Sequence, residues 1–454
     1  MLTIIIIASS IILSNQIRSI RLRRIFNFNR EWKKIKQPKN KISKPDDCEK
    51  STLIGHAGKR PVCVPDNAKH VFICGTTGSG KTVAISNFIQ HVIDKDYPAL
   101  IVDGKGDIGE GSILDITTTM ARAGNKKLYV INLSDTEQSD KYNPFKSVSP
   151  TMAKDMLINM TDWSEEHYKL NAERYIQRIL QMLELAKIEF SFKRIVKCLS
   201  ADKFTEISTH LMKNELISKE EHSENLEILK TSGKIVQSST ARFSTIAEGE
   251  LKHVLTDGGV DISQAMKENA IILFVLNPLI YPELSPAFGR LILIDAKQAI
   301  GTLFKAKTPR TFFIMDEINT YATTGLTDLV NKSRSANVTC ILATQSLSDL
   351  DFANGEAFTE QVIENCNNYL VMRQNSGINA ERWSNILGTR STMEVTYQLQ
   401  QKGLDTAETG FGSAKRVREF LYHPDEIKTL GAGKGFFLSR DTNYNTRINI
   451  YKPF

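Results

Sequence analysis

Short, uninterrupted apolar runs recur along this chain, and each is followed by a turn or by an amphipathic stretch. Val71–Cys74 and Phe312–Met315 are two such runs, a third lies within Val338–Ser346, and a fourth ends at Asp103. Runs without polar alternation are typical of parallel strands that helices cover on both faces. After the first run, Val83–Ile93 shows the apolar spacing of a helix. The pattern predicts an α/β fold with a mostly parallel central sheet.

Between residues 155 and 257 the pattern changes to amphipathic helices, rich in Leu, Ile, Lys and Glu. AERYIQRILQMLELAKIEF, FSFKRIVKCLSADKFTEISTHLMK and SENLEILKTSGKIVQ each place apolar residues on one stripe, with charged residues opposite. We therefore expect an all-helical insertion at 155–257, which divides the α/β domain into a first part at 61–154 and a second part at 258–454. The residues alone are as compatible with a structural lid as with a docking domain.

The C-terminal part returns to a mixed pattern. ERWSNILG predicts a helix that stops at Gly388, and GKGFFLSRD and RINIYKPF predict closing strands. Between them, Thr396–Ser413 is polar and contains Gly403, Gly410 and Gly412. This composition predicts a loop.

The N-terminus begins with an apolar, β-branched run, LTIIIIASSIIL, and continues into a strongly basic stretch. As a helix the run covers about 18 Å, short of the roughly 30 Å hydrocarbon core of a bilayer. Positive charge after an apolar run favours the cytoplasmic side for the chain beyond it, whereas a secretory signal carries its charge before the run. We expect a short membrane anchor at 1–17 and a basic juxtamembrane linker at 18–60. A buried or edge strand is the alternative for the apolar run.

Composition adds two limits to this organisation. With 454 residues, 41% hydrophobic and 24% charged, the chain suits one large domain or two smaller ones. Its six cysteines are scattered, with no CxxC pair and no His/Cys cluster at zinc spacing, which indicates a reduced, cytosolic environment for most of the chain. The formal net charge of +7 says little by itself.

The turn after the first apolar run carries the strongest chemical signal. HVFICGTTGSGKT satisfies the pattern G-x-x-x-x-G-K-[ST], in which glycines let backbone N–H groups point at phosphate oxygens. We expect Lys81 to reach the β- and γ-phosphates and the Thr82 hydroxyl to bind Mg²⁺. A chance match is the alternative, but strand, turn and helix occur in the order that the motif requires. The predicted nucleotide-binding residues are Gly75, Thr76, Thr77, Gly78, Ser79, Gly80, Lys81 and Thr82.

Hydrolysis needs a carboxylate for the metal and a base for the attacking water, and TFFIMDE supplies both at the end of a predicted strand. We expect Asp316 to hold Mg²⁺ through water and Glu317 to deprotonate the nucleophilic water. The alternative is that these acids only cap the next segment. Gln345 follows a third strand and could sense the γ-phosphate or position the water, unless it is a loop residue without a role. The two motifs together predict an NTPase.

Several stretches resemble the TraG/TraD group of type IV coupling proteins, the ring ATPases of conjugative DNA transfer. The resemblance covers about residue 68 to the C-terminus. It rests on HVFICGTTGSGKT, VDGKGD, LSDTEQSDKYNPF, STARFSTIAEGELKHVLTD, FFIMDEI, SRSANVTCILATQS, ILGTRST and KRVREFLYHPDEIKTL. FtsK- and HerA-type translocases share the phosphate-binding turn, the Asp-Glu strand and the glutamine, but are not expected to combine them with KGD, YNPF and HPDEI.

The resemblance implies a RecA-like P-loop NTPase core that hydrolyses ATP with Mg²⁺ as a ring, which we expect to be a homo-hexamer. It places a trans-acting arginine finger at Arg334, with Arg373 as second choice; for either, the residues alone fit a surface salt bridge equally well. Asp103 and Lys105 are expected to shape the mouth of the nucleotide crevice, with a plain turn as the alternative.

The resemblance also implies partners: single-stranded DNA with its relaxase, the components of a type IV secretion channel, and the cytoplasmic (inner) membrane, with the bulk of the chain on the cytoplasmic side. Members usually begin with two membrane spans, whereas this chain shows one short apolar run, which leaves the anchoring open. A double-stranded DNA pump of the FtsK/HerA type and a nucleotide-gated adaptor that recruits protein effectors are the alternatives. Charge runs are more often solvated faces than nucleic-acid tracks, and the candidate DNA contacts are Lys187, Lys193, Arg194, Lys197, Lys332 and Arg334.

Overall fold

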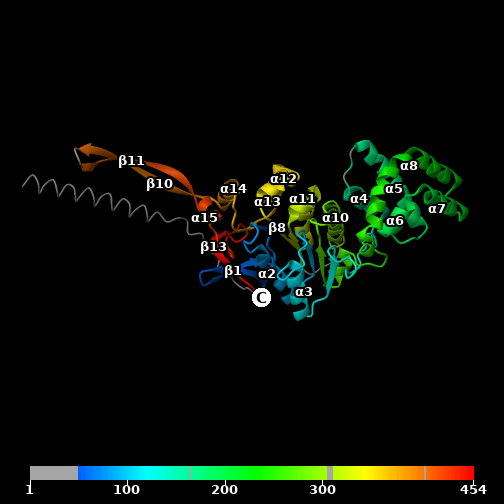
Figure 1. Cartoon of the computed structure of the whole chain (residues 1–454), viewed down its shortest axis with the longest axis horizontal. Coiled ribbons are helices and arrows are strands. Elements are labelled where there is room, and N and C mark those ends of the chain that lie inside the picture. Colours follow the sequence, from blue (N-terminus) through cyan, green and yellow to red (C-terminus); the bar gives the residue numbers. More distant parts are fainter. Residues whose placement is uncertain (1–49, 162, 164, 304–309, 403–404, 454) are drawn as a thin grey trace, which may run out of the picture. The chain divides into compact units, whose positions relative to one another are not determined.

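The computed structural model describes residues 50–161, 163, 165–303, 310–402 and 405–453 (Figure 1). The predicted anchor at 1–17 and most of the predicted linker at 18–60 lie outside these residues. Within the described part of the chain, every helix is too short or too polar to cross a bilayer.

A large sheet forms the centre of the described chain. Over the described residues it has eleven strands in the order β2-β1-β13-β12-β9-β3-β8-β7-β4-β6-β5. From β9 to β5 in this order, each strand runs parallel to the next. Every residue of β4, β6, β7 and β8 is buried, as the uninterrupted apolar runs predict. The bounds are β3 Val71–Cys74, β4 Ala99–Asp103, β5 Leu128–Asn132, β6 Ile271–Val275, β7 Thr311–Asp316, β8 Val338–Thr344 and β9 Asn368–Val371.

Antiparallel strands extend one edge of this sheet, and they include a segment that the sequence pattern assigns to the linker. The strands are β1 (Ser51–Ala57), β2 (Arg60–Pro65), β12 (Lys434–Ser439) and β13 (Tyr444–Ile450). β1 pairs with both β2 and β13, so the predicted linker ends before Ser51 rather than at residue 60. A Cβ on Gly55 would lie 2.4 Å from the Asn449 carbonyl oxygen, so the close pairing of β1 with β13 requires glycine there. The two predicted closing strands are confirmed as β12 and β13.

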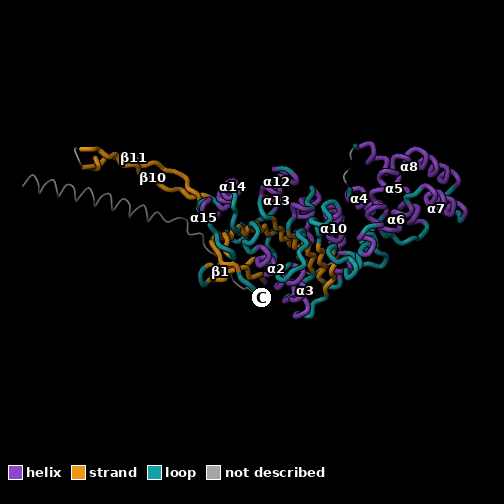
Figure 2. Tube along the Cα trace, viewed as in Figure 1, coloured by secondary structure: helices purple, strands orange, loops and turns teal. Residues whose placement is uncertain are grey.

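Helices cover both faces of the sheet (Figure 2). α2 packs against β1, β3 and β7, and α11 and α12 pack against β8. The helix predicted to stop at Gly388 is confirmed, because α14 ends there at a residue with φ 108°. The helices of the α/β domain are α2 (Lys81–Asp94), α3 (Ile113–Ala123), α9 (Ile262–Lys267), α10 (Leu284–Leu303), α11 (Thr324–Ser333), α12 (Leu347–Asn354), α13 (Glu356–Asn365), α14 (Gly377–Leu387) and α15 (Pro424–Lys428).

The segment between β5 and β6 contributes the amphipathic helices that its pattern predicts. The side chains of Ser149, Ser191, Ser200 and Ser218 cap four of these helices by accepting a backbone N–H of the first turn. The first of them, α4, begins five residues before the predicted boundary at 155 and packs on both α5 and α10. The helices are α4 (Pro150–Met160), α5 (Glu166–Leu185), α6 (Phe192–Cys198), α7 (Ala201–Lys213) and α8 (Lys219–Glu248).

The YNPF turn joins this helical insertion to the α/β domain. The Tyr142 hydroxyl donates to Oδ2 of Asp295 on α10 at 2.7 Å, and Asn143 donates to the Phe190 carbonyl at 3.0 Å. Where the chain returns, Val260 N donates to the Lys141 carbonyl at 2.9 Å. The outgoing and returning segments therefore lie side by side in a buried, hydrogen-bonded junction.

This junction contains a carboxyl group whose protonation affects stability. Burial is the largest cause that raises the pKa of Asp295, from its ordinary 3.8 to about 7, and the nearby Asp261 acts in the same direction. The hydrogen bonds that Tyr142 and Ile262 donate to Asp295 act in the opposite direction. A carboxyl group whose pKa is raised in the folded state contributes most to stability at pH values below its unfolded-state pKa. This contribution is lost as the pH rises to the folded-state pKa. We expect Asp295→Asn, which keeps an acceptor but carries no charge, to raise stability by about 2 kcal/mol more at pH 8 than at pH 5.5. Thermal unfolding at the two pH values measures this, and an equal change at both would contradict it.

The prediction of a loop at Thr396–Ser413 is wrong. The structure has a two-stranded antiparallel ribbon there, β10 (Thr389–Lys402) and β11 (Asp405–Phe420), with Tyr397 opposite Gly412. The apolar residues at every second position from Met393 to Leu399 are typical of a strand, and the glycines concealed this signal. The local alternation and the backbone pairing between the two strands therefore agree in this segment.

Candidate active site

The glycine-rich turn lies at the carboxyl edge of the parallel sheet, between the ends of β8 and β9. Gly75 N donates to the Thr344 carbonyl at 3.2 Å, and Thr76 N donates to the Arg373 carbonyl at 3.0 Å. A Cβ on Gly75 would lie 2.6 Å from the Ser79 Oγ and 2.7 Å from the Met372 Cβ, so the turn can be this tight only with glycine. Both neighbouring strands therefore hold the turn in place.

Helix α2 begins directly after this turn, so the turn lies at its amino end. Gly80 is the N-cap residue, with φ 105°, and no side chain caps the first turn. The first turn also contains no acidic residue. Unpaired N–H groups and the positive end of the helix dipole at such a position favour an anion.

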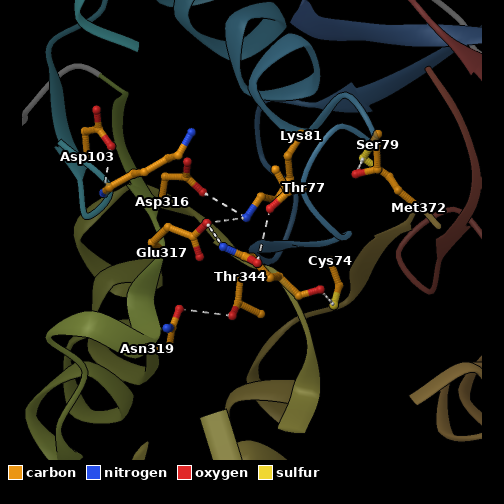
Figure 3. A network of polar contacts seen from close by, with 12 residues as sticks. Cys74, Thr77, Ser79, Lys81, Asp103, Asp316, Glu317, Asn319, Thr344 and Met372 are labelled. Carbon is orange, nitrogen blue, oxygen red and sulfur yellow. Dashed lines mark hydrogen bonds and ion pairs between the residues drawn. The ribbon is translucent and has the colours of Figure 1, made fainter. Parts of the chain in front are cut away.

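Four predicted site residues meet over the turn (Figure 3). Lys81 Nζ donates to Glu317 Oε1 at 2.8 Å and lies 3.8 Å from Asp316 Oδ1. Gln345 Nε2 donates to the same Glu317 oxygen at 3.0 Å. The Thr77 hydroxyl donates to Gln345 Oε1 at 3.4 Å. One chain of hydrogen bonds therefore links the phosphate-binding turn, the end of β8 and the acidic end of β7.

The two acids face the same lysine because the backbone bends between them. Successive residues of a strand point to opposite faces. Glu317 has φ 46° and ψ 50°, a left-handed conformation that ends β7 and brings its side chain to the same side as Asp316. Such conformations cost on the order of 1–3 kcal/mol and cluster at functional sites. The sequence pattern predicts both acids but contains no signal for this bend.

Asp316 fits a magnesium ligand. It is 4% exposed, and its Oδ1 is buried without a hydrogen-bond partner. Burial raises the pKa of Asp316 above its usual range, and Lys81 acts in the opposite direction. Asp316 and Thr82 line the same open cavity of about 690 Å³. A carboxylate oxygen and a hydroxyl beside a phosphate-binding turn are the ligands that Mg²⁺ prefers.

Asp103 and Lys105 line this cavity. Asp103 ends β4 directly opposite Asp316 on β7, and its Oδ1 accepts the backbone N–H groups of Lys105 and Gly106 at 3.0 and 3.3 Å. Burial, and next the Asp316 carboxyl, raise the pKa of Asp103 to about 7. Gly106 has φ 76°, and a Cβ there would lie 1.7 Å from the Leu276 carbonyl oxygen. The KGD loop is thus fixed in position against both β7 and the end of β6.

The two candidate arginines occupy different edges of the sheet. Arg334 is exposed in the short 3₁₀ turn Arg334–Ala336, before the amino end of β8. Arg334 lies near His70, which precedes β3. Burial is the larger cause that lowers the pKa of His70 to about 4, and the positive charge of Arg334 acts in the same direction. Arg373 instead follows β9, and its guanidinium reaches the Thr77 carbonyl at 3.5 Å. Of these two arginines, Arg373 is the one that lies beside the phosphate-binding turn of its own chain.

Sequence reasoning missed three polar residues that support this site. The Thr344 hydroxyl, at the end of β8, donates to Asn319 Oδ1 at 3.3 Å. Gln374 Nε2 donates to the Gln345 carbonyl at 3.3 Å. Each lies within a few residues of the carboxyl end of a predicted strand, which is the signal that could have identified them.

The candidate DNA contacts of the insertion differ in their surroundings. Arg194 is paired with Asp257 and donates to the Glu189 carbonyl, so its charge is compensated. Lys187, Lys193 and Lys197 are exposed.

Comparison with known proteins adds the family. A family model described as the type IV secretion-system coupling protein DNA-binding domain matches residues 55–450, most of the chain. The chain belongs to this family. Among sequence relatives, an uncharacterized protein of Mycoplasma pneumoniae is 31% identical over 140 residues, which cover 31% of this chain and 87% of that protein.

Solved structures share the fold of this coupling-protein family member. The unbound bacterial conjugative coupling protein TrwB is 17% identical, with a TM-score of 0.62 over 89% of this chain and 90% of that chain. TrwB in complex with ADP and Mg²⁺ matches with a TM-score of 0.60, 16% identity, and coverage of 89% and 91%. VirB4 of Thermoanaerobacter pseudethanolicus is 12% identical, with a TM-score of 0.56 and coverage of 89% and 97%.

Proposed function

We propose that this chain is an ATP-driven coupling protein of a conjugative type IV secretion system, which delivers relaxase-bound single-stranded DNA to a membrane channel. The observation that carries the proposal is the convergence of Lys81, Asp316, Glu317 and Gln345 over a glycine turn, in a chain of the coupling-protein family. The likeness to TrwB, which binds ADP and Mg²⁺, supports the choice of nucleotide and metal.

Nucleotide binding begins with a competition for Lys81. In the structure its ammonium group donates to Glu317 Oε1 at 2.8 Å, and both side chains are less than 10% exposed. A triphosphate in the glycine turn offers Lys81 stronger acceptors, the β- and γ-phosphate oxygens. Backbone N–H groups from residue 75 to 82 and the amino end of α2 hold the remaining phosphate charge. Lys81 thereby moves from the acid to the substrate.

The same transfer prepares Glu317 for catalysis. Released from Lys81, the carboxylate keeps the Gln345 contact at Oε1, and its Oε2 is buried without a hydrogen-bond partner. Glu317 then accepts a proton from the attacking water, and Gln345 orients that water while its other end contacts Thr77. Thr82 and Asp316 would hold Mg²⁺, which would supply positive charge to neutralise the phosphates.

Arg334 completes the site from an adjoining copy of the chain. β8 has 7 residues, so Arg334 and the phosphate-binding turn are roughly 20 Å apart along the strand direction. Arg334 therefore cannot serve its own site, which agrees with a trans-acting finger in a homo-hexameric ring. The predicted anchor at 1–17 places this ring at the inner membrane, with the motor on the cytoplasmic side.

Nucleic-acid stimulation tests the proposal. We expect single-stranded DNA to increase ATP turnover of the full-length chain several-fold more than double-stranded DNA of equal length. The turnover of the Glu317→Gln variant serves as the background rate. Stronger stimulation by double strands would favour a pump of the FtsK/HerA type. ATP binding without stimulation by either DNA would favour the adaptor and contradict the motor.

A further inference from the structure

A lysine of the cavity that Thr82 and Asp316 line has no part in the hydrolysis proposed above. Lys105 lines this cavity, and its side chain is 52% exposed. Its ammonium group is paired with the carboxylate of Asp107, which lines the same cavity and is 54% exposed. Exposed ion pairs of this kind contribute little, because water screens them. The ammonium group of Lys105 is therefore easily transferred to a stronger acceptor.

The backbone before Lys105 lies directly against the two acids at the end of β7. Gly104 N donates to the Asp316 carbonyl at 3.2 Å. A Cβ on Gly104 would lie 2.8 Å from the carbonyl oxygens of both Asp316 and Glu317, so this close approach requires glycine. The Asp103 carboxylate accepts the backbone N–H of Lys105 at 3.0 Å. The fold therefore fixes the base of the Lys105 side chain beside the acids.

The ammonium group of Lys105 acts electrostatically on the same acids. Its hydrogen bond to Asp107 is the largest cause that raises the pKa of Lys105, and Glu317 acts in the same direction. Burial raises the pKa of Asp316, and the positive charges of Lys81 and Lys105 oppose this rise. The positive charge of Lys105 thus reaches the acidic end of β7, where the proposed hydrolysis takes place.

Strand order indicates which phosphate this charge can meet. The order β3-β8-β7-β4 places the glycine turn, which follows β3, and the KGD loop, which follows β4, on opposite sides of β7. Lys81 approaches the acids from the side of the turn, and Lys105 approaches them from the other side. The phosphate that extends farthest from the turn towards the acids is therefore the one nearest to Lys105.

We propose that Lys105 is a second phosphate-binding cation, which leaves Asp107 and contacts the terminal phosphate of a bound nucleoside triphosphate. This inference rests on the proposed function and adds a contact that distinguishes ATP from ADP. Phosphate oxygens form strong charge-assisted hydrogen bonds with an ammonium group, so they displace the exposed carboxylate of Asp107. ADP lacks the terminal phosphate and leaves Lys105 paired with Asp107.

Paired affinities for a triphosphate and a diphosphate test this contact in the full-length chain with Mg²⁺. We expect Lys105→Met to raise the Kd for a non-hydrolysable fluorescent ATP analogue about tenfold, and to leave the Kd for a fluorescent ADP analogue within about twofold of wild type. Lys105→Arg keeps the positive charge and is expected to retain most of the ATP affinity. Lys203→Met is the matched control and should change neither Kd, because Lys203 is a 39% exposed lysine paired with Glu206 in the helical insertion. An equal increase for both nucleotides, or no increase for the ATP analogue, would overturn the proposal.

A second variant tests the exchange of partners. Asp107→Asn releases Lys105, so we expect the Kd for the ATP analogue to fall about two- to threefold. In the Lys105→Met background the same change should have no effect. An equal fall in both backgrounds would show that Asp107 repels the phosphate directly, and would overturn the exchange.

The same measurements separate this contact from the proposed function. Wild type that binds neither analogue would refute the proposed function and this contact together. Wild type that binds both analogues, with Lys105→Met indistinguishable from it, would refute the contact of Lys105 alone.

Discussion

Glu317→Gln is expected to reduce ATP turnover by a factor of about 10²–10⁴, the usual contribution of a general base. Glutamine has nearly the same shape as glutamate and can still contact Lys81 and Gln345, but it cannot accept the proton of the attacking water. Phosphate release at saturating ATP and single-stranded DNA measures this effect.

Nucleotide affinity of the same variant provides an independent reading. Glu317 pairs with Lys81 at 2.8 Å, so removing its charge leaves Lys81 available for phosphate. We expect Glu317→Gln to bind a fluorescent ATP analogue as tightly as wild type or more tightly. Glu110→Gln, an exposed acid of the same sheet edge, is the control and should change neither quantity. Turnover of Glu317→Gln within a few-fold of wild type would show that Glu317 is not the base.

The second large effect is expected for Lys81→Met, which keeps the apolar stem and removes the charge. Nucleotide binding should be lost, because Lys81 is the residue expected to hold the β- and γ-phosphates. Stability without nucleotide should also fall, by about 3 kcal/mol, because Glu317 and Asp316 remain buried without their cation. Denaturant unfolding and equilibrium nucleotide binding measure the two consequences.

A double-mutant cycle separates these consequences. Adding Glu317→Gln to Lys81→Met removes one of the stranded charges, so we expect the double variant to regain about 1–3 kcal/mol of stability but no nucleotide binding. Lys126→Met is the control, since Lys126 is a buried lysine paired with Asp96 far from the site, and it should lower stability without affecting nucleotide. Additive effects of Lys81→Met and Glu317→Gln would contradict an energetically important ion pair.

Local patterns make the centre of this protein predictable. β3, the glycine turn and α2 are consecutive, so their order and chemistry are legible in one short segment. The acids after β7 and the glutamine after β8 are also predictable, because parallel strands bring their carboxyl ends to one edge. Membership of the coupling-protein family confirms the resemblance that these segments suggest.

Prediction fails where pairing partners are distant in sequence or where glycines suggest a loop. The pattern assigns β1 to a linker because its partner β13 lies near the other end of the chain, and no local pattern reports that pairing. The β10–β11 ribbon is predicted as a loop when glycine content is weighted above strand alternation. Backbone hydrogen bonds between strands decide both cases, and single-segment propensity does not contain them.

The sequence by itself determined the central parallel strands and α2, the glycine turn that we expect to hold phosphate, and which acids and amide stand at the strand ends, because hydrophobic period and turn chemistry are local properties. Only the tertiary structure decided how these groups face each other. The left-handed bend at Glu317, its ion pair with Lys81 and the distance of Arg334 from its own site arise from strand order and packing. The same is true of the cavity lined by Thr82 and Asp316, where residues 108 and 279–280 meet because β4 and β6 are neighbours in the sheet.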